Sequence, residues 1–245
     1  IKPINPIITS KIEEQIIPSM QLTLSDNDFD YLDSNKKEFV KTVLPIIINE
    51  NQNILMIRSF VSELKGKLET FRTLNNKEIR KLNEIAKKYN IKHHNKHKLD
   101  LVDEILSNVD IIPNSIALAQ AAIESGWGKS RFAKEYNALF GEYTYDNSKG
   151  VIPLERENGD THLIKAFSSY SNSVESYFDN INSHNAYEDF RDIRNIMRER
   201  NNFSNVNLLV NKLSTYAEDE NYIKTIRQVI KTNNFSIFDQ KTISY

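Results

Sequence analysis

The sequence predicts a mainly α-helical protein of the α+β class with one small β-hairpin, and three observations lead to this. The 245 residues include only 6 Gly and 6 Pro and many Leu, Ile, Lys and Glu, a composition that favours helices. Most segments repeat apolar residues at helical spacing. Residues 142–168 instead alternate in character around Asn158-Gly159, the dipeptide most typical of a tight hairpin.

The first 98 residues are expected to form an N-terminal arm and a helical region. Residues 1–35 contain Pro3, Pro6 and Pro18, which predict an extended arm with little regular structure. Residues 36–72 show helical spacing and predict one or two helices, with a kink or a restart at Pro45.

A further helix is predicted at residues 77–89, where Asn75-Asn76 can cap its first turn, and a basic loop follows at residues 91–98. Residues 99–245 are expected to form the second domain. Its predicted helices lie at 99–108, from Pro113-Asn114 to Glu124, at 129–136 and, after the hairpin, at 171–184, 187–200, 204–215 and 219–232.

Composition argues against several classes of protein. The formal net charge is −1, so no global field attracts nucleic acid or an anionic membrane. Cysteine is absent, which excludes disulfides and thiolate metal sites. No apolar run approaches the roughly 18–20 residues that span a bilayer. The chain begins with Ile1, and we expect that a signal peptide or anchor was removed from it.

Residues 117–133 are the most informative stretch. They place Glu124 at the end of an apolar helix, where Gly126-Trp127-Gly128 stops it, because glycine tolerates the left-handed conformation that ends helices. Apolar surroundings disfavour a charged carboxylate and raise its pKa, as a general acid near neutral pH requires. The plainer interpretation is a glutamate that caps the helix or forms an ion pair.

Three motifs in this order resemble the glucosaminidases of glycoside hydrolase family 73, which are bacterial peptidoglycan hydrolases. The first is Gln-x-x-x-Glu-Ser-x-Trp-Gly-x-Ser, present at 120–130, and the others are Asn-Ala-Leu-Phe-Gly at 137–141 and Thr-Tyr-Ala-Glu-Asp-Glu-Asn-Tyr at 215–222. Within the family the chain is most similar to the Bax-like branch, through residues 109–113, 125–133 and 159–162. The resemblance implies a lysozyme-like domain at 99–245.

By this resemblance Glu124 is the general acid, and the positive charge that develops on the sugar needs a second stabilising group. Glu155 in the hairpin is our first choice for that carboxylate, and the adjacent Arg156 would lower its pKa. Glu157, two residues further on, is the alternative. A third possibility is that the N-acetyl group of the substrate serves instead of a protein carboxylate.

The resemblance also suggests residues that line the cleft. Tyr216 is expected to hydrogen-bond the N-acetyl group or the attacking water, and Phe140 to line the cleft from the Leu-Phe-Gly turn. Trp127 is either core packing or the floor of a sugar site. Tyr222 matches a cleft tyrosine of the family but suits the core, and Ser125 either contacts substrate or caps the helix end.

No metal and no cofactor are expected. His93 and His97 have the spacing of two zinc ligands on a helix, but no acidic residue lies between them. The neighbouring Lys92, Lys96 and Lys98 would repel a cation, so the His93, His94 and His97 cluster is interpreted as a solvated basic loop, with contact to an anionic cell wall as a weaker hypothesis.

Together these observations predict an endo-β-N-acetylglucosaminidase that hydrolyses β-1,4 bonds of peptidoglycan or of another glycan that contains N-acetylglucosamine. The alternatives are an N-acetylmuramidase or lytic transglycosylase on the same fold, or a non-catalytic cell-wall binding protein. We expect a monomer without nucleic-acid or cofactor partners, located in the periplasm or elsewhere in the cell envelope or outside the cell. The role of residues 1–98 and the stereochemistry of hydrolysis stay open.

Overall fold

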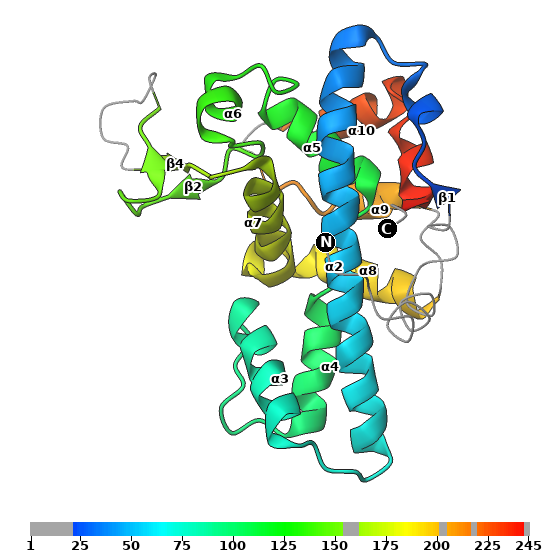
Figure 1. Ribbon diagram of the computed structural model, residues 1–245, viewed down its shortest axis with the longest axis vertical. Coiled ribbons are helices and arrows are strands. Elements are labelled where there is room, and N and C mark those ends of the chain that lie inside the picture. Colours follow the sequence, from blue (N-terminus) through cyan, green and yellow to red (C-terminus); the bar gives the residue numbers. More distant parts are fainter. Residues whose placement is uncertain (1–21, 154–161, 201–204, 217–219, 243–245) are drawn as a thin grey trace.

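One long helix organises the molecule. The computed structural model describes residues 22–153, 162–200, 205–216 and 220–242. Helix α2 (Ser34–Glu69) runs along most of the longest dimension of the protein (Figure 1). Near one of its ends lie α5 (Asn114–Glu124), α6 (Arg131–Tyr136) and α10 (Tyr222–Thr232), and beside the other lie α3 (Asn76–Lys88) and α4 (Lys98–Asn108).

The sequence predicted one or two helices at residues 36–72, and the structure has one continuous helix there, α2. The Asp33 carboxylate caps it by accepting a hydrogen bond from the Lys36 N–H at 3.1 Å. Pro45 lies inside the helix and does not restart it. Apolar side chains are buried from Phe39 to Leu64 against α4 and α5, and this packing offsets the backbone hydrogen bond that proline cannot make.

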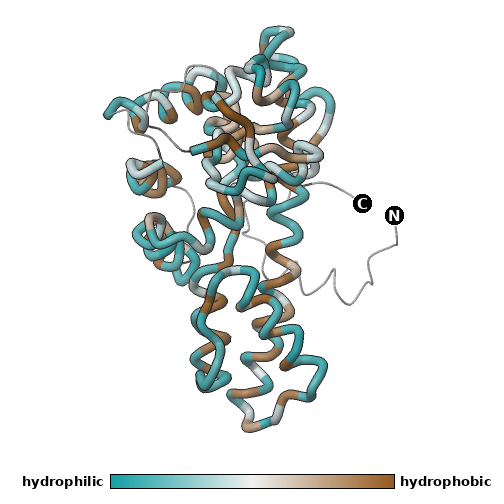
Figure 2. The backbone as a smooth tube through the Cα atoms, turned by 90° about the vertical axis from the view of Figure 1, so that its left-hand side faces the viewer, coloured by the Kyte–Doolittle hydropathy of each residue, from teal (hydrophilic) through white to brown (hydrophobic). Residues whose placement is uncertain are grey.

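Helix α3 begins where its sequence predicts. The Asn75 side chain accepts hydrogen bonds from the N–H groups of Lys77 and Glu78, and the Glu78 carboxylate accepts one from the Asn75 N–H in return. Its apolar residues Leu82 and Ile85 are buried, while most of its other side chains are exposed. Hydrophilic and hydrophobic residues alternate in this way along the helices of the protein (Figure 2).

Helix α5 is buried on almost all sides, as its apolar sequence predicts. It packs against α2, α10 and the 3₁₀ helix η3 (Phe235–Gln240). Strand β1 (Leu22–Thr23) pairs in parallel with β5 (Lys241–Thr242), and the 3₁₀ helix η1 (Asp26–Phe29) contacts α2. Segments that are far apart in the sequence, residues 22–23 and 241–242, are therefore paired in space.

The predicted hairpin is present as part of a three-stranded antiparallel sheet. Its order is β2-β4-β3, with β2 at Tyr143–Thr144, β3 at Gly150–Val151 and β4 at Leu163–Lys165. A side chain could not fit at Gly150, because a Cβ there would lie 2.5 Å from the Leu163 Cβ. Asn158-Gly159, Glu155 and Glu157 lie outside the described residues. Helices and this small sheet together confirm the predicted fold class.

The remaining helices follow the sheet: α7 (Tyr170–Ser183), the 3₁₀ helix η2 (Asn185–Tyr187), α8 (Glu188–Glu199) and α9 (Val206–Val210). The sequence predicted a longer helix, at 204–215. The prediction is wrong for residues 211–215, which are not helical. Asn211 ends the helix, and Asn, Ser and Thr after it favour turns because their side chains compete for backbone hydrogen bonds.

A buried ionic network joins α2 to the rest of the protein. The Asp110 carboxylate, with 0% of its side chain exposed, pairs with Arg58 of α2 at 3.4 Å and is hydrogen-bonded by Arg198 of α8 at 2.8 Å. Arg194 donates to the carbonyl of Asp110 at 2.9 Å and to the Asn182 side chain at 2.7 Å. Burial alone would raise the pKa of Asp110, but Arg58 and Arg198 outweigh it and hold that pKa well below its ordinary value of 3.8.

Replacing Asp110 with Asn should lower the free energy of unfolding by about 3–5 kcal/mol, because it leaves buried guanidinium groups without their counter-charge. Denaturant unfolding at neutral pH measures the change. Asp189→Asn is the matched control: this exposed carboxylate pairs with Lys212 at the surface, and its loss should cost less than about 1 kcal/mol. Equal effects of the two substitutions would contradict a structural role for the network.

Candidate active site

The end of α5 is formed by three consecutive residues in the left-handed region. Gly126, Trp127 and Gly128 have φ angles of 56°, 59° and 72°. Glycine adopts this conformation at little cost, whereas tryptophan does not. The Ser125 hydroxyl closes the turn: it donates to the Ala121 carbonyl at 2.5 Å and accepts from the Gly128 N–H at 2.8 Å. Ser125 is fully buried, and its hydroxyl is used inside the turn as a helix-end cap.

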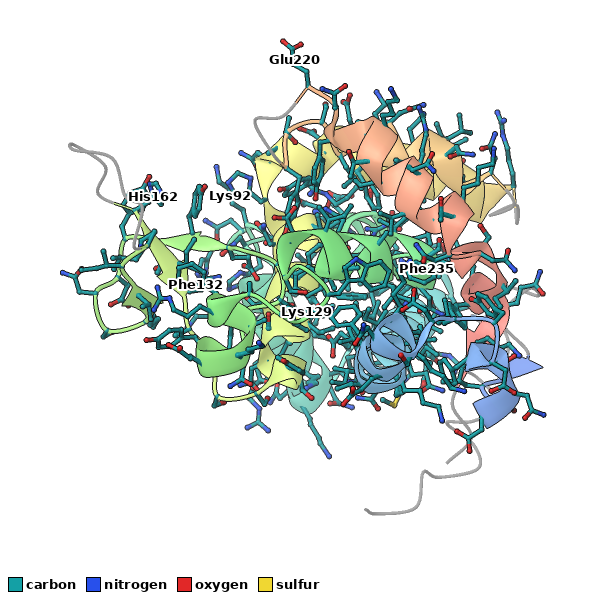
Figure 3. All side chains as sticks on the ribbon, turned by 90° about the horizontal axis from the view of Figure 1, so that it is seen from above. Lys92, Lys129, Phe132, His162, Glu220 and Phe235 are labelled. Atoms are coloured by element: carbon teal, nitrogen blue, oxygen red, sulfur yellow. The ribbon has the colours of Figure 1, made fainter. Side chains whose placement is uncertain are left out.

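Packing by other elements holds Trp127 in its strained conformation. Its ring contacts Phe39 of α2 edge-on at 5.7 Å and Phe235 of η3 at 6.1 Å, and the Lys36 ammonium lies 5.2 Å from the ring centroid. Phe235 is labelled in Figure 3. A Cβ at Gly128 would lie 3.1 Å from the Phe39 ring, so glycine also allows α2 to approach the turn closely. Trp127 thus serves mainly as packing under the turn.

A chain of hydrogen bonds leads from the core to Glu124. The Tyr177 hydroxyl donates to the Gln120 side-chain oxygen at 2.6 Å, and the Gln120 amide donates to the Tyr222 hydroxyl at 2.9 Å. The Tyr222 hydroxyl in turn donates to Oε1 of Glu124 at 2.8 Å. Because each group has its donor and acceptor roles fixed, Oε1 can only accept, and a protonated Glu124 carries its proton on Oε2.

The second oxygen of Glu124 lies beside the Leu-Phe-Gly turn. A Cβ at Gly141, whose φ is 61°, would be 3.5 Å from Oε2, so glycine keeps space next to this atom. No described residue is hydrogen-bonded to Oε2. Partial burial raises the pKa of Glu124 above its ordinary value of 4.5, and the Tyr222 hydrogen bond offsets part of the rise. A raised pKa and a free oxygen are what a general acid requires.

Aromatic rings pack along this hydrogen-bonded chain. Tyr216 stacks parallel to Tyr222 at 5.8 Å and donates its hydroxyl to the Phe140 carbonyl at 2.9 Å. The buried ring of Phe140 stacks on Tyr177 at 4.0 Å. Burial raises the pKa of Tyr216 well above 10, so it stays a neutral donor. Tyr216, Phe140 and Tyr222 are therefore brought together with Glu124, as the sequence motifs suggest.

Glu142 is a buried carboxylate near the site that sequence reasoning missed. Its side chain is 6% exposed, and Oε2 accepts hydrogen bonds from Lys165 of β4 and Ser176 of α7, both at 3.0 Å. Burial raises its pKa, and Lys165 and Ser176 lower it in part. This contact fastens β4 to α7 and to the Leu-Phe-Gly turn. The only sequence signal is its position directly after Gly141.

The histidine cluster does not lie on one helix. His97 precedes the first residue of α4, and His93 lies in the loop before it, where its ring contacts the His94 ring at 4.3 Å. The helical arrangement of two zinc ligands is therefore absent, since a turn separates the two side chains. Within the described ranges, no group of three or more potential ligands could hold a metal ion, and no helix is long and apolar enough to cross a membrane.

Comparison with known proteins identifies the family. The family model Glucosaminidase, described as mannosyl-glycoprotein endo-beta-N-acetylglucosaminidase, matches residues 99–235, more than half of the chain. The match contains Glu124 and its aromatic neighbours. The chain belongs to the glucosaminidase family, and residues 99–235 are a glycoside hydrolase domain, which confirms the predicted resemblance.

The chain is also similar to individual proteins. The protein Bax of Escherichia coli K12 is 32% identical over 184 residues, which cover 74% of this chain and 63% of Bax. Peptidoglycan hydrolase FlgJ of the same organism is 37% identical over 92 residues, 34% of this chain and 29% of FlgJ. The chain thus spans less than two thirds of these relatives. The catalytic domain of the autolysin Auto from Listeria monocytogenes aligns over 97% of this chain and 99% of that domain, with a TM-score of 0.47 and 15% identity.

Tyr222→Phe should raise the pKa of Glu124 further, because the lost hydroxyl stabilised the charged carboxylate. A general acid must be protonated, so the alkaline limb of the pH–rate profile should move to higher pH. Tyr216→Phe is the control, since its hydroxyl donates to a carbonyl and not to Glu124. A shift to lower pH in Tyr222→Phe, or an equal shift in Tyr216→Phe, would contradict the assigned hydrogen bond.

Proposed function

We propose that this protein is an endo-β-N-acetylglucosaminidase that hydrolyses the β-1,4 bond between N-acetylglucosamine and the following N-acetylmuramic acid of peptidoglycan. The observation that carries the proposal is Glu124. Its carboxyl is partly buried, has a raised pKa, and is held by Tyr222, while Oε2 has no hydrogen-bond partner among the described residues. Membership of the glucosaminidase family supports the reaction class. The relative FlgJ, named a peptidoglycan hydrolase, supports the choice of substrate.

In the proposed reaction, Glu124 transfers the proton on Oε2 to the glycosidic oxygen as the bond from that oxygen to the anomeric carbon breaks. Water then adds to the anomeric carbon and gives up a proton to a carboxylate, either Glu124 or the second one. The starting state is restored when Glu124 carries a proton again and the second carboxylate carries none. Tyr222 keeps the Glu124 carboxyl in one orientation and Gly141 leaves room for the leaving oxygen. These steps require proton transfer and charge stabilisation and call for no metal or cofactor.

Glu155 remains our proposal for the second carboxylate. The described ends of β3 and β4, Gly150–Val151 and Leu163–Lys165, flank the segment that carries it. The Glu142–Lys165 contact anchors β4, and hence one end of this segment, to the helical part. Glu157 and the N-acetyl group of the substrate stay the alternatives, as the sequence left them.

Residues 99–245 are proposed to carry catalysis and residues 1–98 to support it. The turn Gly126–Gly128 that follows Glu124 is called the catalytic turn. Phe39 of α2 packs against its Trp127, and Arg58 of α2 pairs with Asp110, so α2 is part of the packing that shapes the site. Given its substrate, we further propose that the protein acts in the cell envelope or outside the cell. It is proposed to act as a monomer.

Glu124→Gln should reduce the release of new reducing ends from purified peptidoglycan by at least about 100-fold, the usual scale of a general acid. The control is Glu135→Gln, which should retain activity. It is the same substitution at an exposed glutamate of α6, whose carboxylate pairs with Arg131. Thermal unfolding shows that both variants are folded. Substantial activity in Glu124→Gln would refute the proposed role.

The choice of second carboxylate has its own test. Glu155→Gln should lose about 100-fold in rate or more, whereas Glu157→Gln should stay close to wild type. A loss in Glu157→Gln alone would exchange the two assignments. Full activity in both variants would contradict a protein carboxylate and favour assistance by the substrate's N-acetyl group.

A further inference from the structure

Positive charge is concentrated at the end of α2 remote from Glu124. Residues 76–98 contain eight Lys and Arg and two Glu, a formal charge of +6 in a chain whose net charge is −1. They form α3 and the loop that leads to α4, which lie at the opposite end of α2 from α5 and α6 (Figure 1). Much of the tube is hydrophilic in this part of the molecule (Figure 2). This face is called the basic end below.

Two hollows adjoin each other on the basic end. One, of about 460 Å³, is lined by Ile91 together with polar and basic side chains: Lys87, Asn90, Lys92, His93 and His94. The other, of about 370 Å³, shares Lys87 and His93 with the first and adds five residues: Asn76, Ile79, Arg80, Asn83 and Glu84. The two hollows therefore lie side by side and have these two side chains in common.

Two lysines that line these hollows lack carboxylate partners within the part of the chain that the structure describes. Lys87 and Lys92 are exposed and form no ion pair there (Lys92 is labelled in Figure 3). Their neighbours differ: Lys88 pairs with Glu175 at 2.7 Å, and Lys96 pairs with Glu104. The His93 and His94 rings, tilted by 35° with their centroids 4.3 Å apart, add nitrogen atoms to the lining of the larger hollow. Cations gathered in a concavity focus their field and attract anions.

We propose that the basic end binds a linear polyanion whose charges are phosphate groups. Two hollows with a shared wall suit successive charges on one strand better than a single ion. The larger hollow is lined by Lys87, Lys92, His93 and His94, whose side-chain nitrogen atoms can donate hydrogen bonds. A tetrahedral phosphate presents acceptor oxygens in several directions, whereas a carboxylate presents them in one plane. A flat bilayer cannot reach into a concavity, so a strand fits this face better than a membrane surface.

Such a contact would give the protein two attachment points. Helix α2, with 36 residues, is about 54 Å long at 1.5 Å per residue, and it separates the basic end from the catalytic turn. Attachment at one end raises the effective concentration of glycan at the other if both ligands belong to the same cell envelope. The binding itself does not depend on the proposed hydrolytic activity.

The test measures binding of fluorescently labelled linear polyphosphate by the full chain, at low and at high salt. Wild type should bind at low salt and release the polymer at high salt. Lys87→Ala/Lys92→Ala should bind about tenfold more weakly or worse. Lys224→Ala/Lys231→Ala, which removes two exposed lysines of α10, is the matched control and should bind as wild type. Circular dichroism shows that the variants are folded.

Several results would overturn the proposal: no polyphosphate binding at low salt, an equal loss in the control variant, or binding of poly-glutamate as tight as that of polyphosphate. Binding to vesicles of anionic phospholipid without binding to polyphosphate would assign the face to a membrane and contradict it too. Glu124→Gln should bind polyphosphate like wild type, so a failure of the catalytic proposal is distinguished from a failure of this one.

Discussion

The burial of helix α2 is the constraint on which the rest of the structure depends. Phe39 near its start packs against Trp127 and keeps three left-handed residues in place after Glu124. Arg58 in its second half binds the buried Asp110, and α8 supplies the other arginines of that network. Its last turns carry the α3–α4 pair. Although the family model begins at residue 99, the catalytic turn is shaped by a helix that ends before it.

Two glutamates, Glu124 in the site and Glu142 beside it, illustrate how the partners of a carboxyl group decide its chemistry. Burial raises the pKa of both Glu124 and Glu142. Glu142 has a cation beside it, Lys165, and the ion pair fixes β4 to α7. Among the described residues, Glu124 is hydrogen-bonded only by the neutral Tyr222, so there its charged form gains one hydrogen bond and no counter-charge. A carboxyl in the second situation can hold a proton near neutral pH and pass it on, whereas one in the first is a structural anchor.

Local signals in the sequence were sufficient for much of this account. An apolar helix followed by Gly-Trp-Gly located Glu124, Asn75 located the start of α3, and Asn158-Gly159 located the hairpin region. Long-range contacts were not readable in the same way. Tyr222 suited the core, yet its hydroxyl reaches Glu124, which lies 98 residues away in the chain. The sequence pattern also does not reveal the ion pair of Glu142 or the continuation of α2 beyond Pro45. Both depend on contacts with residues that are distant in the sequence.

The central claim is that this chain cleaves the bond after N-acetylglucosamine, and the identity of the new chain ends tests it most directly. Purified peptidoglycan is digested, the products are reduced with borohydride, and the reduced ends are identified by mass spectrometry. Reduced N-acetylglucosamine is the result that the account predicts. Reduced N-acetylmuramic acid or anhydro-muramic acid ends would contradict it and would make the protein a muramidase or a lytic transglycosylase.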